Sequence, residues 1–164
     1  MIRPIRLQRS RRPGASLQTE SLAVNGLPAV IVTRPGKWGN PFDFRKSDFG
    51  WLALSYGCRA DPRGRQEASV KAFREWITPV AGLTVGRYER GVSFGNDQKS
   101  VAIGPRIDVG PAPTLREIRA ELRGRNLACW CKAPVYDTEG TIVRPGDPCH
   151  ADVLLEIANA EDPS

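Results

Sequence analysis

The spacing of apolar residues along the chain predicts strands and helices in alternation. Residues 28–33 form a β-branched run before a proline and a glycine, which is typical of a strand that leads into a tight loop. Apolar residues then recur at helical spacing over residues 66–77, which predicts an amphipathic helix that Thr78 and Pro79 end. The apolar positions of this helix are Val70, Phe73, Trp76 and Ile77.

Residues 80–112 form a glycine-rich stretch that lacks a clear period. Short β-type runs at 83–88 and 101–103 indicate a hairpin or a long excursion. We expect that this stretch could serve as a lid over a binding site.

The last third of the chain predicts helix, strand and helix in succession. Thr114 and Glu117 have the spacing of a capping box, and Gly124 supplies the end of the helix that they begin. Residues 126–131 then indicate a strand, and a final helix starts within residues 148–152. The inward-facing residues of the two helices are expected to be Leu115, Ile118, Leu122, Val153, Leu154 and Ile157.

This alternation predicts an α/β fold. We expect a single, three-layer-like domain over residues 17–158, with a small, partly parallel sheet flanked by helices. A basic arm over residues 1–16 precedes the domain, and a short tail over residues 159–164 follows it.

The composition is that of an ordinary soluble protein, since 40% of the 164 residues are hydrophobic and 26% are charged. No stretch approaches the roughly 20 apolar residues that span a bilayer, so we expect no membrane association. The first arginines are followed by Pro13 and Gly14 and not by an apolar segment, which argues against a secretory signal. We therefore expect a cytoplasmic protein with reduced cysteines, and a homodimer as the default oligomer.

Positive charge is concentrated in the N-terminal arm. The net charge is +6, and five of the 24 basic residues lie within the first twelve positions. Such an arm could bind a phosphate backbone, with a solvated tail as the alternative. The candidate nucleic-acid-binding residues are Arg6, Arg9, Arg11 and Arg12.

Three of the four cysteines and the only histidine fall in two short segments. Cys129 and Cys131 are two residues apart, so a bend at the end of their strand could bring both sulfurs onto one tetrahedral zinc ion. Cys149 and His150 are adjacent, and both could join only if Cys149 lies in the turn before the final helix. Three ligands would leave an open coordination position for water or substrate, whereas four would close the site.

Two other interpretations of the cluster stay open. A cysteine at a helix N-terminus beside a histidine has a lowered pKa, so Cys149 could act as a nucleophilic thiolate with His150 as its proton carrier. The cysteines could instead be small buried hydrophobic residues without chemistry. Cys58 stands apart from the cluster and is expected to be incidental.

The loop over residues 34–42 is the second candidate site. Its glycines permit tight turns, and its basic side chains and amides could hold an anion such as phosphate. Trp38 or Phe42 could stack a base, although aromatic residues that flank a turn more often pack inward. The substrate-binding candidates are Arg34, Lys37, Trp38, Gly39 and Asn40.

Four motifs together resemble a known family, the domain of unknown function 4326, which occurs in small bacterial and phage proteins. The motifs lie at residues 5–9, 32–42, 122–131 and 148–154. The resemblance spans most of the chain, although residues 80–112 and 132–147 form longer segments than the family pattern. It implies no established activity, and it carries the motif set over to Arg34, Trp38, Gly39, Asn40, Cys129, Cys131, Cys149 and His150.

These observations favour a small α/β enzyme that acts on a nucleotide or nucleic-acid component. Cys149, His150 and Asn40 would carry the reaction at a zinc or thiolate centre, and hydrolysis that releases or modifies a base would fit either centre. The alternative is a non-catalytic nucleic-acid-binding module of phage or bacterial origin, in which zinc staples the C-terminal helix. A protein-interaction domain is a third possibility, and it would need neither the loop nor the arm.

Overall fold

The structure is a computed structural model that describes residues 2–46, 50, 53–54, 56–78, 92–94, 101–103, 109 and 111–162. The chain divides into two compact units. The first unit combines Met1–Gly39 with Pro113–Ser164, and the second comprises Asn40–Ala112. The single domain expected over residues 17–158 stays a prediction, because two compact units can still fold together as one domain.

Three short parallel strands form the sheet of the first unit. Their order across the sheet is β1 (Arg6–Gln8), β5 (Asn126–Cys129) and β2 (Ala29–Ile31). All residues of β5 are buried, as is usual for the central strand of a parallel sheet that is covered on both faces. Because the strands run in one direction, their carboxyl ends meet at one edge, which is where α/β proteins commonly bind ligands.

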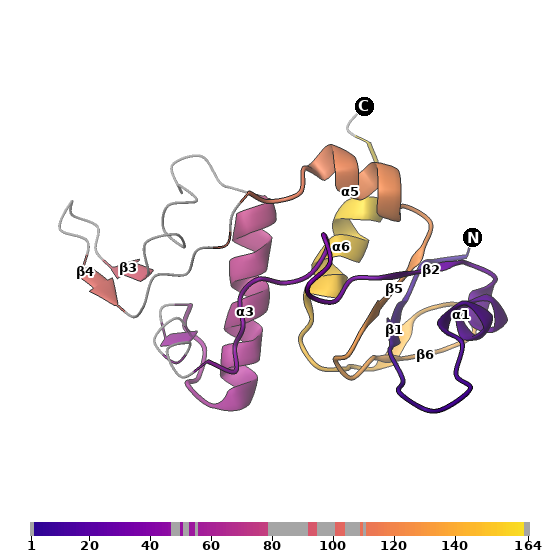
Figure 1. Cartoon of the computed structure of the whole chain (residues 1–164), viewed down its shortest axis with the longest axis horizontal. Coiled ribbons are helices and arrows are strands. Elements are labelled where there is room, and N and C mark those ends of the chain that lie inside the picture. Colours follow the sequence, from indigo (N-terminus) through magenta and orange to yellow (C-terminus); the bar gives the residue numbers. More distant parts are fainter. Residues whose placement is uncertain are drawn as a thin grey trace. The chain divides into compact units, whose positions relative to one another are not determined.

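Helices cover this sheet on two sides. Helix α6 (His150–Asn159) packs against β5 and β1, and α1 (Leu17–Asn25) packs against β2. Figure 1 shows α6 on one side of the strands and α1 on the other. Helix α5 (Leu115–Leu122) packs on α6. The predicted α/β class, with a small sheet flanked by helices, is confirmed, and both strand pairings of this sheet are parallel.

The first strand lies inside the stretch that the sequence indicated as a basic arm, residues 1–16. Ile5 is buried, and the Arg6 residue is only 1% exposed. This part of the chain is therefore a component of the core. Its sequence, Arg-Leu-Gln, shows no apolar alternation, and the strand owes its place to hydrogen bonds with β5, such as the one that Arg9 N donates to the carbonyl oxygen of Cys129.

Local signals fix the ends of the helices in the first unit. The capping box of α5 is present, because the Glu117 backbone N–H donates to Thr114 Oγ1 at 3.1 Å and the Thr114 N–H donates to Glu117 Oε2 at 2.8 Å. Helix α1 ends at Gly26, whose φ of 75° favours glycine. No helix in the described ranges is both long and apolar enough to cross a bilayer.

A small antiparallel hairpin, β6 (Val135–Tyr136) with β7 (Ile142–Arg144), follows the central strand. It reaches the outer edge of β1, where the Arg6 backbone N–H donates to the hydroxyl of Tyr136 at 3.1 Å. The hairpin thus supplies an acceptor for a strand edge that would otherwise face solvent.

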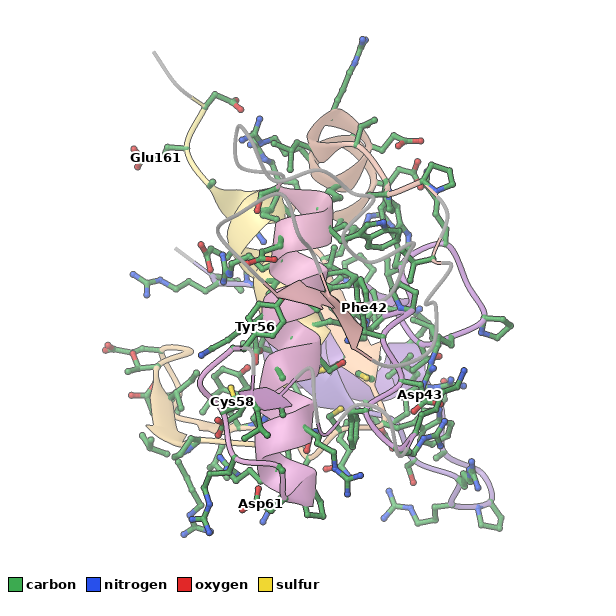
Figure 2. The ribbon with its side chains drawn as sticks, turned by 90° about the vertical axis from the view of Figure 1, so that its left-hand side faces the viewer. Phe42, Asp43, Tyr56, Cys58, Asp61 and Glu161 are labelled. Atoms are coloured by element: carbon green, nitrogen blue, oxygen red, sulfur yellow. The ribbon has the colours of Figure 1, made fainter. Side chains whose placement is uncertain are left out.

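The second unit is organised around α3 (Pro62–Ile77). This helix begins four residues before the predicted start at residue 66, because Asp61 caps it by accepting from the Gly64 N–H at 2.8 Å and Pro62 suits its first position. Figure 2 shows Asp61 at the start of α3, with Tyr56 and Cys58 on the segment before it. Phe42 meets Trp76 edge to face, with ring centroids 6.2 Å apart, and Phe73 lies 5.9 Å from the same ring.

The glycine-rich stretch contains one described strand pair, β3 (Val92–Phe94) with β4 (Val101–Ile103), which is antiparallel. The strand predicted at residues 101–103 is confirmed, and the hairpin uses residues 92–94 as its partner. The run predicted at residues 83–88 lies outside the described residues, and the lid stays a prediction.

Candidate metal centre

The cluster residues lie where the central strand ends and the last helix begins. Cys129 is the final residue of β5, and Cys131 follows in a bend, so the strand stops two residues before the predicted end at 131. Cys149 occupies the N-cap position of α6 in an extended conformation, with φ −149° and ψ 139°, and His150 is the first helical residue. Cys149 therefore lies in the turn before the helix, as simultaneous ligation by both residues requires.

The four side chains converge. The ligand atoms of Cys129, Cys149 and His150 all lie within 4.8 Å of one another, and these residues are buried. The fourth residue, Cys131, is half-buried, and its Sγ is 3.8 Å from Cys129 Sγ. Metal–sulfur bonds of about 2.3 Å at tetrahedral angles place two ligand sulfurs about 3.8 Å apart. The cluster could hold a metal ion.

The His150 ring is oriented by its surroundings. Its Nε2 lies 2.7 Å from the carbonyl oxygen of Val32, which can only accept, so this nitrogen carries a proton. Burial lowers the pKa of His150, so the ring is neutral and Nδ1 has a lone pair. Nδ1 lies 3.8 Å from Cys149 Sγ. A histidine that donates one N–H to a backbone carbonyl and turns the other nitrogen to a ligand site is typical of metal centres.

The three thiols hydrogen-bond to one another. Hydrogen bonds from Cys131 and Cys149 lower the pKa of Cys129 to about 2, which favours the thiolate form of Cys129. Hydrogen bonding to Cys129 raises the pKa of Cys131 to about 11, and it raises the pKa of Cys149 well above the ordinary range. The predicted fall in the pKa of Cys149 is wrong, because the neighbouring thiolate and burial outweigh the helix dipole. A protonated, buried Cys149 is a poor nucleophile.

A buried guanidinium lies beside the thiols. Arg6 Nε is 3.0 Å from Asp152 Oδ1, and its Nη2 donates to the backbone oxygen of Asp147 at 2.8 Å. Arg6 Nη1 is buried, and the described residues offer it no hydrogen-bond partner. The charge of Arg6 favours the thiolate form of Cys131, against the larger opposite effect of Cys129. Arg6 therefore stabilises negative charge on the cluster.

Gly146 brings the two halves of the cluster together. The Asp147 N–H donates to the carbonyl oxygen of Lys132 at 2.9 Å, which joins the segment after Cys131 to the segment before Cys149. A Cβ atom at position 146 would overlap the backbone of Lys132 and Ala133. Only glycine permits this approach, because the opposing atoms are backbone and cannot move aside cheaply.

The first part of the predicted substrate loop contacts the cluster. Trp38 is 7% exposed, so it packs inward, and its backbone hydrogen-bonds to the His150 ring. Lys37 is engaged with α5, since its Nζ lies 3.1 Å from Glu117 and 2.8 Å from Glu121. Gly39 is required where it stands, because a Cβ there would lie 2.8 Å from the backbone of Arg34.

Asn40 belongs to the second unit, and its amide serves local structure there. Its Nδ2 donates to Ser69 Oγ at 2.8 Å, and its Oδ1 accepts from the Phe42 N–H at 2.9 Å. Phe42 is 1% exposed and is a core anchor of that unit. The substrate contacts expected of this loop stay predictions.

Four arginines were nucleic-acid candidates, and the structure separates them. Arg6 is buried against Asp152 and cannot reach a partner in this conformation. Arg12 pairs with Glu20 at 3.5 Å on the surface. Arg9 donates from Nη1 to Thr33 Oγ1 at 2.9 Å, so it is fixed at the carboxyl end of β2. Only Arg9 and Arg11 therefore keep their guanidinium charges available for a partner.

The family model described as Domain of unknown function (DUF4326) matches residues 16–160. The chain belongs to this family. No curated protein and no solved structure matches the chain significantly. The match includes every cluster residue and the loop from Arg34 to Asn40, whereas β1 and the arginines before residue 16 lie outside it.

A groove of about 880 Å³ runs along the outer side of β1 in this DUF4326 protein. Residues of β1, the end of α1 and the β6–β7 hairpin line it, among them Arg3, Asn25 and Tyr136. Neither the cluster cysteines nor Lys37, Trp38, Gly39 and Asn40 line this groove. The groove is therefore distinct from the cysteines and from this loop, and Arg6 is the residue that both lines the groove and lies beside the thiols.

Several residues of the DUF4326 site were not found by sequence reasoning. Val32, which contributes a backbone oxygen, and Asp152, which pairs with Arg6, were not indicated. Arg6 was indicated only as a nucleic-acid candidate and not as a residue beside the thiols. Trp130 stands between two cluster cysteines, and its exposure of 41% distinguishes it from the buried residues around it. The signal that the sequence offers is the alternation of a strand, which places Trp130 on the face opposite to Cys129 and Cys131.

Proposed function

We propose that the first unit is a zinc-stapled nucleic-acid-binding module, with Cys129, Cys131, Cys149 and His150 as the zinc ligands. The observation that carries the zinc assignment is the convergence of three thiols and one neutral imidazole nitrogen at tetrahedral spacing. Thiolate sulfur and imidazole nitrogen together favour zinc over calcium or magnesium, which prefer oxygen ligands.

A structural role for the metal is favoured over a catalytic one. Four protein ligands fill a tetrahedral site, whereas catalytic zinc keeps one position for water or substrate. Cys129, Cys149 and His150 are also buried, which limits the approach of a substrate. The metal would join the end of β5 to the start of α6, two elements that pack against each other.

Nucleic acid is the favoured partner because of charge. The net charge is +6, and Arg9 and Arg11 lie near the carboxyl edge of the sheet without a carboxylate partner among the described residues. Unneutralised arginines on a basic protein bind phosphate by displacing counterions from the nucleic acid.

Metal analysis of purified, untagged protein tests the zinc assignment. Wild type is expected to hold about one zinc per chain, and Cys149→Ser to hold almost none. Cys58→Ser is the matched control, because Cys58 is a buried cysteine of the second unit and is not part of the cluster. Equal zinc in wild type, Cys149→Ser and Cys58→Ser would contradict the assignment.

An enzyme acting on a nucleotide or nucleic-acid component is the second candidate, and the half-exposure of Cys131 favours it. If Cys131 is not a ligand, the remaining three leave an open position at which a water could be activated. Cys131→Ser separates the two functions. Loss of zinc from this variant supports the structural module, whereas full retention of zinc supports the enzyme.

A further inference from the structure

Trp130 lies directly after β5, between two proposed zinc ligands in the chain, and it is exposed. It follows Cys129 directly, and its neighbours in the chain are largely withdrawn from solvent. Burying an indole ring is strongly favourable, so an exposed ring held by well-packed neighbours indicates a surface that receives a partner.

Two guanidinium groups lie against this one ring. The Cζ atom of Arg9 is 4.3 Å from the ring centroid, and that of Arg11 is 4.7 Å from it. Both distances are within the range of cation–π attraction. Arg9 is fixed further by its hydrogen bond to Thr33 Oγ1. The two arginines are therefore held in place before any partner binds.

Their charges are not neutralised within the described part of the chain. Arg12 pairs with Glu20, and Lys37 pairs with Glu117 and Glu121, but neither Arg9 nor Arg11 has a carboxylate partner there. A guanidinium that stacks on a ring through its face directs its N–H groups outward from the ring, where they can donate to phosphate oxygens. Arg9 uses Nη1 for Thr33 and keeps its other N–H groups for a phosphate. The pair thus presents fixed phosphate donors beside an aromatic ring.

We infer that Trp130, Arg9 and Arg11 form a binding site for single-stranded nucleic acid, an inference that rests on the proposed nucleic-acid function. The two guanidinium groups bind consecutive phosphates, and an unpaired base stacks on the guanidinium–indole layer. Base–aromatic stacking of this kind tolerates any sequence, because every base has a π face. Zinc would hold the backbone on both sides of Trp130, since the proposed ligands Cys129 and Cys131 flank Trp130 in the chain.

A single strand fits these residues better than a duplex. Bases in a duplex are stacked on one another and do not offer a face to a protein ring. Reading a major groove requires a projecting helix or a two-stranded ribbon, whereas this site lies at the ends of β1 and β5.

Fluorescence anisotropy with a labelled oligothymidylate of about 12 nucleotides tests the inference, with a hairpin duplex of the same charge as the second probe. Zinc-loaded wild type should bind the single strand at least about tenfold more tightly than the duplex. Arg9→Ala, Arg11→Ala and Trp130→Leu should each weaken binding about tenfold. Each arginine variant should also lower the salt slope by about 0.7, the value for one phosphate contact on a single strand.

Arg144→Ala is the matched control, because it removes the same charge from the exposed strand β7. It should weaken binding less than about twofold. Trp130→Phe should restore most of the affinity lost in Trp130→Leu, because it keeps an aromatic face. Zinc content and circular dichroism equal to wild type confirm that each variant is folded.

The possible results distinguish a failure of this binding site from a failure of the proposed nucleic-acid function. If wild type binds the single strand and all three variants bind like Arg144→Ala, this site is overturned while the nucleic-acid function stands. Preference for the duplex overturns the single-strand assignment. If wild type binds neither probe, the nucleic-acid function itself is overturned, and the zinc assignment is decided by metal analysis alone.

Discussion

The cores of the two compact units are both apolar in the main, but they differ in the charged and metal-ligating groups that they bury. The core of the first unit contains buried polar groups: Arg6, Asn126, His150 and the cluster thiols. The core of the second unit is aromatic and small-residue packing around α3, with Phe42, Phe73 and Trp76 in contact. Buried polar groups stabilise a core only when their partners are present, whereas apolar packing needs no ligand. We therefore expect the stability of the first unit to depend on bound metal and the stability of the second unit to depend on the volume of its core side chains.

Removal of zinc should have the largest effect. Structural zinc contributes on the order of 10 kcal/mol to folding in small metal domains, so chelation should unfold the first unit while α3 stays protected. Hydrogen exchange followed by mass spectrometry measures both units at once. Equal loss of protection in β5 and in α3 would show that the two cores do not respond separately.

Truncation of a side chain in the core of the second unit should destabilise that unit and leave zinc binding by the first unit unchanged. Phe73 is fully buried, so Phe73→Ala should lower the free energy of unfolding by about 3–5 kcal/mol through lost contacts and a cavity. Denaturant unfolding gives the magnitude, and zinc content should stay at the wild-type value. Val70→Ala, at a half-buried position of the same helix, is the control, and its expected loss of free energy of unfolding is smaller.

The sequence predicts those features of the fold and of the site that depend on residues close together in the chain. The capping box at Thr114, the placement of Cys149 before the last helix and the approach of Cys131 to Cys129 each depend on residues that are neighbours in the chain. Nearest-neighbour chemistry of this kind leaves a clear pattern.

The rest depends on contacts between distant segments. Arg6 is buried because Asp152, far along the chain, neutralises it, and nothing in the sequence around Arg6 reveals that partner. The ion pairs that the exposed Lys37 makes with α5 and the stacking of Arg9 on Trp130 are also long-range contacts. Even the start of α3 was misplaced, because the apolar period begins after its cap at Asp61.

A change at Gly146 should affect the metal core moderately. Gly146→Ala forces a Cβ against the backbone after Cys131, so we expect zinc affinity to fall about 10- to 100-fold, as for other changes in the support of a metal site. Competition with a chromophoric chelator measures this affinity. Gly140→Ala is the control, because its Cβ would meet only the Arg3 side chain at 3.6 Å, although its φ of 80° adds some strain. Equal affinity in both variants would contradict the role given to Gly146.

The smallest expected effect is a pH dependence at α5. The Thr114 backbone N–H and then Lys37 lower the pKa of Glu117 from its ordinary value of 4.5 to about 2. Because the folded-state pKa is depressed, the stabilisation is complete above pH 4.5 and is lost as the pH falls towards 2. Urea unfolding at several pH values should show that the free energy of unfolding falls less between pH 4.5 and pH 2 for Glu117→Gln than for wild type. If the free energy of unfolding depends on pH equally in both proteins, Glu117 is not the cause of this pH dependence.

X-ray absorption at the zinc edge tests the central claim most directly, because it reports which atoms surround the metal. Protein purified with its native metal should show three sulfur ligands at about 2.3 Å and one nitrogen at about 2.0 Å, unchanged in Cys58→Ser. A shell dominated by oxygen or nitrogen, or protein that holds no zinc, would contradict the assignment of Cys129, Cys131, Cys149 and His150 as a zinc staple.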